Sequence, residues 1–369
     1  MRYFIGLMSG TSMDGVDAVL CQQSGSDFST ISAVSTEFDS ALLRQLHQLC
    51  TPGFDEIHIG QQASVALAHH YARAVQLLLE NSQLTPQHIA AIGCHGQTVR
   101  HAPPGTGTRY PYTLQLGCPA TLATQTQIDV VSDFRMKDIA LTGQGAPLVP
   151  IFHHSVFASE QNRRCIINIG GISNVTVLQG KQPPLGHDTG PGNTLLDQWI
   201  QAHHHQPYDD KGQWAASGTI NRALLVDLLN DAYFLKPAPK STGREYFNME
   251  WLNSILQNHN GVGTQDVQAT LVELTAQSIA ESIEQTAQTD EYFACGGGTY
   301  NAYLMERLAH HLGAKRLATT SELGIHPMQV EAAAFAWLAN AFVDRKPGNV
   351  PAVTGANKPT ILGSFTPFA

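Results

Sequence analysis

Apolar residues near the start of the chain gather in short runs, and glycine, serine and aspartate fill the gap between the first two. These runs cover residues 3–8 and 16–21, and a third covers residues 30–38. Short apolar runs bounded by turn residues are typical of strands. We therefore expect a β-hairpin at the N-terminus, with residues 9–15 as its turn, and a third strand after it.

The spacing of hydrophobic residues changes after the third run. Residues 61–80 place apolar side chains on one helical face, which predicts a long amphipathic helix. Residues 89–94 form a continuous apolar run that predicts a buried strand, and this run ends at His95-Gly96-Gln97-Thr98. Because α/β sheets place ligands beyond the carboxyl ends of their strands, this polar cluster is a candidate site.

The second half of the chain opens on the same pattern. Residues 165–169 and 175–178 are apolar runs on either side of a glycine-bearing turn at residues 170–174. A further strand is predicted at residues 292–295, and helices are predicted at residues 194–203, 219–229, 266–287, 300–312 and 328–342. This weak internal repeat indicates two α/β domains, which we assign to residues 1–140 and 141–369.

The composition agrees with two folded domains. The chain has 369 residues, of which 43% are hydrophobic and 14% are charged, whereas a typical soluble domain has about 25% charged residues. This apolar content excludes a disordered chain. The net charge of −9, without any basic run, argues against nucleic acid as a partner.

The sequence also indicates where the protein is found. No apolar run reaches the ~20 residues that a membrane helix needs, so we expect no membrane association. The N-terminus becomes polar at Ser9, too early for the apolar core of a signal peptide. The 6 cysteines include no Cys-x-x-Cys pair, which is typical of free thiols in a reducing compartment. These features predict a cytoplasmic protein.

Three glycine-bearing turns are candidate anion sites, since the common phosphate-loop, dinucleotide, esterase and zinc-protease motifs are absent. They lie at residues 9–17, 170–174 and 296–298. Glycines let backbone amides approach an anion, and serine and threonine hydroxyls add donors. Each turn alone also fits an ordinary hairpin or tight turn, but three of them in two similar halves favour a bound nucleotide.

A loop rich in glycine, residues 186–193, leads into the predicted helix at residues 194–203. Asp188 in this loop can act as a general base, or it can cap the helix. Asn193 or Thr189 could cap the helix instead, and we favour the catalytic role for Asp188.

Charged residues are scarce, so the group formed by Asp129, Asp133, Arg135 and Asp138 is informative. Arg135 can bind a carboxylate or phosphate through two parallel hydrogen bonds, or it can belong to a surface ion pair.

Histidine offers two further interpretations. His95 can either satisfy hydrogen bonds in the core or contact a substrate, while the neighbouring Gln97 suits recognition of hydroxyl or amide groups. Histidine pairs such as His69-His70 are adjacent in sequence, and adjacent residues on a helix point in different directions. We therefore predict no histidine-bound metal.

Taken together, these motifs make the chain resemble the 1,6-anhydro-N-acetylmuramic acid kinase family, a member of the actin/Hsp70/sugar-kinase superfamily. The resemblance covers essentially the whole chain. It rests on residues 6–17, 95–98, 133–135, 168–176, 188–193, 295–298 and 327–332.

The resemblance implies a pair of RNase H-like (actin-like ATPase) α/β domains, with ATP and sugar meeting in a cleft between them. It implies an ATP-dependent kinase that hydrolytically opens the 1,6-anhydro ring of anhydro-N-acetylmuramic acid and phosphorylates O6. The products are N-acetylmuramate 6-phosphate and ADP, and the reaction belongs to peptidoglycan recycling. A homodimer is expected from the family alone.

The resemblance also assigns site residues by position. Asp188 becomes the base that activates water, and it contacts the sugar together with His95, Gln97 and Arg135. The expected nucleotide-binding residues are Gly10, Thr11, Ser12, Met13, Asp14, Gly15, Val16, Asp17, Gly170, Gly171, Gly296, Gly297 and Gly298.

Magnesium is expected to arrive with ATP. Many superfamily members carry an aspartate in the first strand that helps to place this ion, but the corresponding stretch here reads Ile5-Gly6-Leu7. Asp14 or Asp17 could act through water instead. The alternatives to the main assignment are a kinase of another amino sugar, a phosphatase on the same fold, and a non-catalytic sugar-sensing module.

Overall fold

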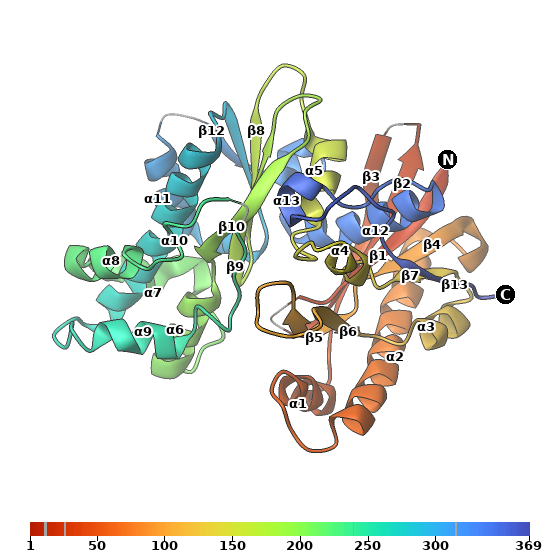
Figure 1. Cartoon of the computed structure of the whole chain (residues 1–369), viewed down its shortest axis with the longest axis horizontal. Coiled ribbons are helices and arrows are strands. Elements are labelled where there is room, and N and C mark those ends of the chain that lie inside the picture. The colour runs from red at the N-terminus through yellow and green to blue at the C-terminus, as the bar shows by residue number, and fades with distance from the viewer. Residues whose placement is uncertain (11–12, 26, 239, 314–315) are drawn as a thin grey trace. The chain divides into compact units, whose positions relative to one another are not determined.

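The computed structural model describes the whole chain except Thr11, Ser12, Ser26, Pro239, Ala314 and Lys315. The described residues form two compact units, each built around its own large sheet (Figure 1). The first unit consists of Met1–Val156 and Gln329–Ala369, and the second consists of Phe157–Met328. The chain therefore leaves the first unit, forms the second and then returns.

The sheet of the first unit has the strand order β13-β7-β4-β1-β2-β3. Its strands are β1 (Arg2–Met8), β2 (Gly15–Ser24), β3 (Asp27–Glu37), β4 (Ile89–Cys94), β7 (Val130–Ser132) and β13 (Ser364–Thr366). β1 pairs antiparallel with β2 and parallel with β4, and β4 pairs parallel with β7. The predicted N-terminal hairpin, third strand and buried strand are all present.

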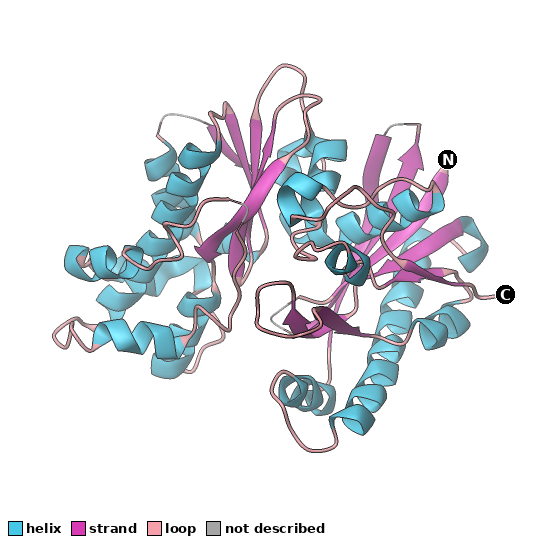
Figure 2. Cartoon of the chain, viewed as in Figure 1, coloured by secondary structure: helices cyan, strands magenta, loops and turns pink. Residues whose placement is uncertain are grey.

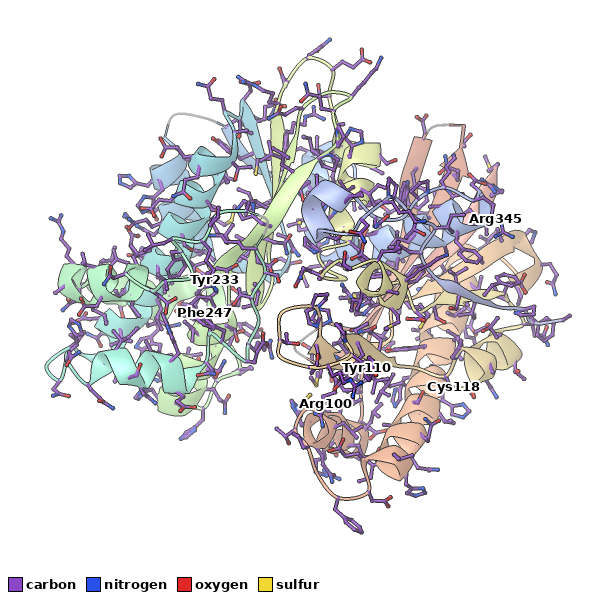
Figure 3. All side chains as sticks on the ribbon, in the orientation of Figure 1. Arg100, Tyr110, Cys118, Tyr233, Phe247 and Arg345 are labelled. Carbon is purple, nitrogen blue, oxygen red and sulfur yellow. The ribbon has the colours of Figure 1, made fainter. Side chains whose placement is uncertain are left out.

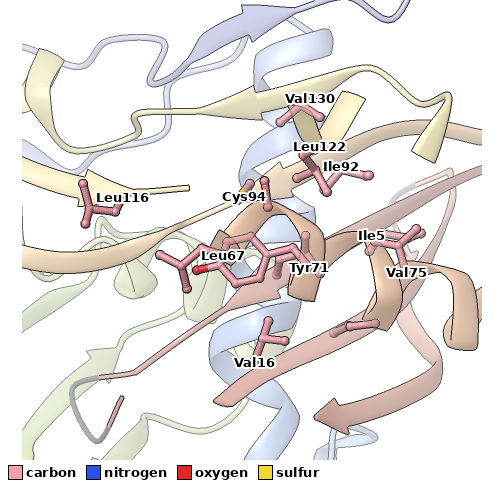
Figure 4. Packing of buried hydrophobic residues seen from close by; sticks show 14 of the residues in the cluster. Ile5, Val16, Leu67, Tyr71, Val75, Ile92, Cys94, Leu116, Leu122 and Val130 are labelled. Carbon is pink, nitrogen blue, oxygen red and sulfur yellow. The ribbon is translucent and has the colours of Figure 1, made fainter. Parts of the chain in front are cut away.

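One face of this sheet packs against α2 (Glu56–Ser82). Leu67, Tyr71 and Val75 of α2 lie in one core cluster with Ile5 and Ile92 from the strands (Figure 4). The apolar face of the predicted helix at residues 61–80 therefore buries itself against the strands, as its spacing predicted.

The other face of the sheet carries α12 (Val330–Val343), at very short range. A methyl group on Gly6 would overlap the backbone oxygen of Ala332, and one on Gly93 would overlap that of Phe335. Glycine at these two strand positions lets the helix backbone approach the sheet.

The observed units differ from the domains predicted from the sequence, and the difference lies in the segment that contains α12. The sequence analysis assigned residues 141–369 to one domain, whereas Gln329–Ala369 belongs with the first unit. The physical reason is that this segment supplies both a helix that covers β1 and β4 and the edge strand β13.

The second unit has the strand order β10-β9-β8-β11-β12. Its strands are β8 (Arg164–Ile169), β9 (Ile172–Leu178), β10 (Leu185–Pro191), β11 (Glu291–Cys295) and β12 (Arg316–Thr319). Helices gather on one side of this sheet, as Figure 2 shows. They include α6 (Thr194–His204), α7 (Gln213–Ser217), α8 (Arg222–Leu229), α9 (Met249–Leu256), α10 (Thr264–Thr286) and α11 (Ala302–Leu312).

The two sheets share one topology. In each unit the strand order runs third, second, first, fourth, fifth along the chain, and β13 is added at the edge of the first sheet. In each, the first three strands are antiparallel and the fourth runs parallel to the first. The predicted pair of RNase H-like α/β domains is thus confirmed.

Several short elements were not predicted from the sequence. They are α1 (Ser40–Leu49), β5 (Gln97–Ala102), β6 (Tyr112–Leu116), α3 (Pro119–Thr126), α4 (Met136–Ala140), α5 (Val149–Phe157) and α13 (Pro351–Thr354), together with β7, β10, β12, β13, α7 and α9 above. Among the residues that the structure describes, no helix is both long enough and apolar enough to cross a bilayer.

Candidate active site

The candidate residues fall into two groups, one in each unit. In the first unit, the loop between β1 and β2 is held by its own backbone and by Gln97 at the start of β5. The oxygen of Gly10 accepts hydrogen bonds from Met13 N at 3.2 Å and from Gln97 Nε2 at 3.1 Å. The Ser9 hydroxyl lies 2.7 Å from that of Tyr71. Thr11 and Ser12, both predicted nucleotide contacts, lie outside the described residues.

The last three residues of the predicted phosphate loop belong to strand β2 instead. Val16 is buried in the core cluster, so its side chain packs rather than contacts a ligand. Gly15 lies against β3, where a methyl group would overlap the oxygen of Thr36. Asp17 accepts a hydrogen bond from Ser35 Oγ at 2.5 Å.

The electrostatics of Asp17 bear on cation binding. Burial raises the pKa of its carboxyl above the ordinary 3.8, the bond from Ser35 lowers it, and the negative charge of Asp14 raises it further. Asp14 and Asp17 therefore repel each other at the end of this loop, and a nearby cation would relieve that repulsion.

The structure brings together the three predicted sugar contacts of the first unit. Arg135 Nε donates to His95 Nε2 at 3.0 Å, and Arg135 Nη1 donates to Gly145 O at 2.7 Å. Gln97 is buried and holds the oxygen of Gly10. Arg135 is thus tied to His95, and Gln97, two residues further along the chain, holds the N-terminal loop.

His95 is neutral in this arrangement. Its Nε2 accepts the bond from Arg135, so its ring proton lies on Nδ1. Burial, and next the positive charge of Arg135, hold the pKa of His95 well below the ordinary 6.5. The side chain acts as an acceptor that orients Arg135, not as an acid at neutral pH.

Asp138 holds the loop that contains Gly145, whose oxygen binds Arg135. It is fully buried, and its Oδ2 accepts from the backbone N–H of Gly145 at 2.8 Å. Its Oδ1 accepts from Asn349 Nδ2 at 2.7 Å and from Thr354 Oγ1 at 2.8 Å. Asp138 therefore fixes the loop whose Gly145 oxygen binds Arg135, and the sequence had marked this aspartate only as part of a charged group.

The sequence analysis missed another titratable neighbour of Arg135, which is His101 on β5. His101 is exposed, its Nδ1 lies 2.9 Å from Thr113 Oγ1, and the positive charge of Arg135 disfavours its protonation. The sequence of this strand, Gln97-Thr98-Val99-Arg100-His101-Ala102, does not alternate polar and apolar residues, so no local pattern revealed it.

In the second unit, Asp188 lies on β10 rather than in a loop. Only 9% of the residue is exposed. Its Oδ2 accepts from the backbone N–H of Thr242 at 3.0 Å, its own N–H donates to Lys240 O at 3.2 Å, and its oxygen accepts from Tyr233 Oη at 2.8 Å. The residue at the N-cap of α6 is Asn193, so Asp188 does not cap this helix.

The predicted glycine turns of the second unit lie together. The oxygen of Gly171 accepts from the N–H groups of Gly192 at 2.9 Å and Thr194 at 3.0 Å, and the oxygen of Gly170 accepts from Asn193 N at 2.8 Å. These contacts pack the hairpin turn onto the start of α6.

The triple glycine, residues 296–298, lies against the end of β8 and near Asn193. Gly296 has a φ of 82°, and an added Cβ would lie 2.6 Å from Asn168 Oδ1. A Cβ on Gly298 would overlap the side chain of Ile169, and one on Gly297 would lie 3.8 Å from Asn193 Nδ2. The absence of side chains at these positions lets the backbone of this segment approach Asn168 and Ile169 closely.

The sequence matches a known protein family over nearly its whole length. A family model described as anhydro-N-acetylmuramic acid kinase matches residues 2–368. The chain is 50% identical over 367 residues to the protein of that name from Shewanella pealeana, covering 99% of both chains. It is 48% identical over 366 residues to the one from Saccharophagus degradans, again covering 99% of both.

Solved structures give a more distant likeness. Component A of the (R)-2-hydroxyglutaryl-CoA dehydratase from Acidaminococcus fermentans is 12% identical, with a TM-score of 0.47. The match covers 92% of this chain and 100% of that one.

Proposed function

Because the chain belongs to the anhydro-N-acetylmuramic acid kinase family, we propose that it opens the 1,6-anhydro ring of anhydro-N-acetylmuramic acid and phosphorylates O6 at the expense of ATP. The products are N-acetylmuramate 6-phosphate and ADP, and the reaction serves peptidoglycan recycling. The observation that carries this proposal is the family match over residues 2–368. The rigidly held Asp188 adds a base suited to the chemistry.

Asp188 acts as the base. It removes a proton from a water molecule whose oxygen attacks the anomeric carbon, and the bond from that carbon to O6 breaks. The electron pair left on O6 then attacks the γ-phosphorus of ATP, and ADP leaves. Three hydrogen bonds hold Asp188, which suits a step that depends on positioning more than on a reactive side chain.

The sugar contacts come from the first unit. Arg135 is a permanent cation, and its planar guanidinium matches the lactyl carboxylate of the substrate. His95 and Gly145 hold this guanidinium through two hydrogen bonds. Gln97 joins the sugar group to the nucleotide loop through Gly10, so the same side chain serves both substrates.

ATP is bound by backbone. Gly10, Met13 and Asp14 of the N-terminal loop face its phosphates, and the turns at residues 170–171 and 296–298 line the nucleotide. No lysine is needed for this, because backbone amides in tight turns bind anions on their own.

Magnesium fits as an ion carried by ATP. Within the described part of the chain, no group of three or more His, Cys, Asp or Glu residues is placed to hold a metal. Asp14 and Asp17 offer carboxylate oxygens to a hydrated ion, and burial, with a smaller effect from the charge of Asp14, raises the pKa of Asp17. When bound, Mg²⁺ neutralises phosphate charge, which phosphoryl transfer requires.

The protein is further expected to work in the cytoplasm as a homodimer. Its substrates are the small molecules ATP and anhydro-N-acetylmuramic acid, and it acts on neither nucleic acid nor membranes. Analytical ultracentrifugation of the purified protein tests the dimer directly, and a single monomer boundary across the concentration range would contradict it.

The decisive variant is Asp188→Asn, which keeps the shape of the side chain and removes its basicity. We expect sugar-dependent ADP release to fall about 10²–10⁴-fold, while binding of a non-hydrolysable ATP analogue, measured by calorimetry, stays the same. Asp227→Asn is the control, since this carboxylate of the second unit is 51% exposed and lies 2.8 Å from His259 Nε2. An undiminished rate in Asp188→Asn would overturn the role of base.

Two further measurements separate the alternatives. Mass spectrometry of product made in ¹⁸O-water should find the label on the anomeric oxygen, as hydrolytic ring opening demands. A panel of amino sugars distinguishes a kinase of another sugar, release of phosphate from sugar phosphates would indicate a phosphatase, and binding without turnover would indicate a sensor.

A further inference from the structure

The segment between α8 and α9 carries an aromatic cluster that the proposed chemistry has not yet used. Tyr233 is buried, and its ring centroid lies 5.9 Å from that of Phe234, 5.4 Å from Phe247 and 6.1 Å from Tyr246. Figure 3 labels Tyr233 and Phe247 within this cluster. Such a cluster gives a loop a rigid core of its own.

This segment contacts Asp188 through three separate atoms. Tyr233 donates to the backbone oxygen of Asp188, Lys240 accepts from its N–H, and Thr242 donates to its carboxylate. Phe234 adds packing nearby, since a Cβ on Gly190 would lie 2.8 Å from its ring. Both the backbone and the side chain of Asp188 are therefore tied to one loop.

The side chain of Lys240 contacts the backbone of Tyr233 and Phe234 in the same loop. Its Nζ lies 3.4 Å from Phe234 O and 3.5 Å from Tyr233 O, and it sits 5.0 Å from the centroid of the Tyr233 ring. Lys240, whose carbonyl accepts from Asp188, thus also contacts Tyr233, whose hydroxyl donates to Asp188.

The strand itself needs this support. β10 is the edge strand of its sheet, and its pairing with β9 shifts register between Asp188 and Gly190. A register shift redirects side chains and interrupts the ladder, so the sheet alone does not fix the orientation of Asp188. The loop supplies hydrogen bonds on the side where the sheet ends.

We propose that Tyr233 is a positioning residue for Asp188, and that together with Lys240 and Thr242 it orients the carboxylate for proton removal from water. This inference rests on the proposed role of Asp188 as base. It assigns to the phenol hydroxyl of Tyr233 an effect on the chemical step without any contact to substrate.

The test compares two tyrosine-to-phenylalanine variants in the same cluster. Tyr233→Phe keeps the ring and removes the hydroxyl that binds Asp188, while Tyr246→Phe removes a hydroxyl that binds Asp231 at 2.8 Å. We expect kcat to fall about five- to tenfold in Tyr233→Phe, with the KM values for sugar and ATP unchanged. Tyr246→Phe should retain the wild-type kcat.

The outcomes separate the two proposals. Equal kcat in the two variants, or a rise in both KM values with a matching loss of thermal stability in Tyr233→Phe alone, would overturn the positioning role. Asp188→Asn is assayed alongside: if it retains turnover, the assignment of the base fails. If Asp188→Asn is inactive and Tyr233→Phe behaves like Tyr246→Phe, the base stands and only the positioning role is lost.

Discussion

Two buried histidines make the stability of the folded protein depend on pH. His153 is 0% exposed and His187 is 3% exposed. Burial lowers the pKa of His153 to about 3, and burial with the charge of Lys240 lowers that of His187 to about 4. The folded protein keeps both rings neutral at pH values where an unfolded chain protonates them.

The sign of the pH effect follows from these pKa values. At pH values below the ordinary pKa of 6.5, the unfolded chain binds protons that the folded chain does not. The free energy of unfolding therefore decreases as the pH is lowered from 6.5 to about 4. Each histidine contributes up to ~1.4 kcal/mol per pH unit. We expect a loss of about 2 kcal/mol between pH 6 and pH 5 from the two together, measured by urea unfolding.

The matched variant for this prediction is His153→Gln, which no longer titrates in this range. Its free energy of unfolding should fall less steeply than that of the wild type, by the contribution of one histidine, up to ~1.4 kcal/mol per pH unit. Parallel pH dependences in the wild type and the variant would contradict the assignment.

The residue scale also separates what the sequence could predict from what it could not. The Gly-rich environment of Asp188 marked it as a candidate base. Its partners Tyr233, Lys240 and Thr242 lie 45 or more positions away in the chain, and no local pattern relates them to it. Only the folded chain brings these residues together.

At the scale of elements, strand β10 is the informative failure of sequence-based prediction. Residues 186–193 contain glycines and a proline, which are typical of loops. Residues 186–191 nevertheless belong to strand β10, because β9 pairs on one side and Lys240 accepts a hydrogen bond on the other. Tertiary partners overrode local preference here, whereas the strongly apolar strands β1, β4, β8 and β11 could be predicted directly.

The contact between α12 and the first sheet leads to an element-scale prediction. Gly93→Ala puts a methyl group where the oxygen of Phe335 lies, so either the helix or the strand must move. We expect a loss of about 1–3 kcal/mol in the free energy of unfolding, measured by chemical denaturation.

Gly53→Ala provides the control for this substitution. The nearest atom to a Cβ there is Thr51 O at 4.0 Å, so the added methyl group meets no obstruction. Equal stability of the two variants would show that α12 does not need the glycine.

At the scale of the whole molecule, chain order and spatial order differ. The two hairpins at the start of each half could be read from the sequence and correctly indicated two similar units. The return of Gln329–Ala369 to the first unit could not, since α12 is apolar along most of its length and would suit either core.

Fragments of the chain test this arrangement. We expect the fragment Phe157–Met328 to fold by itself, because all five strands of its sheet and their covering helices lie within it. The fragment of residues 1–140 lacks α12 and β13, so its sheet stays uncovered on one face and it should not fold. Far-ultraviolet circular dichroism and cooperative thermal unfolding distinguish the two, and cooperative unfolding of the shorter fragment would refute the expectation.

The return of the chain to its first unit also sets an order on synthesis. A ribosome delivers every residue of the second unit before α12 and β13 emerge, and domains fold as their sequences become complete. Until Gln329–Ala369 has been translated, the N-terminal strands lack the helix that covers Gly6 and Gly93, and this face stays open to solvent and to chaperones. The half of the protein that is made first is the half that is finished last.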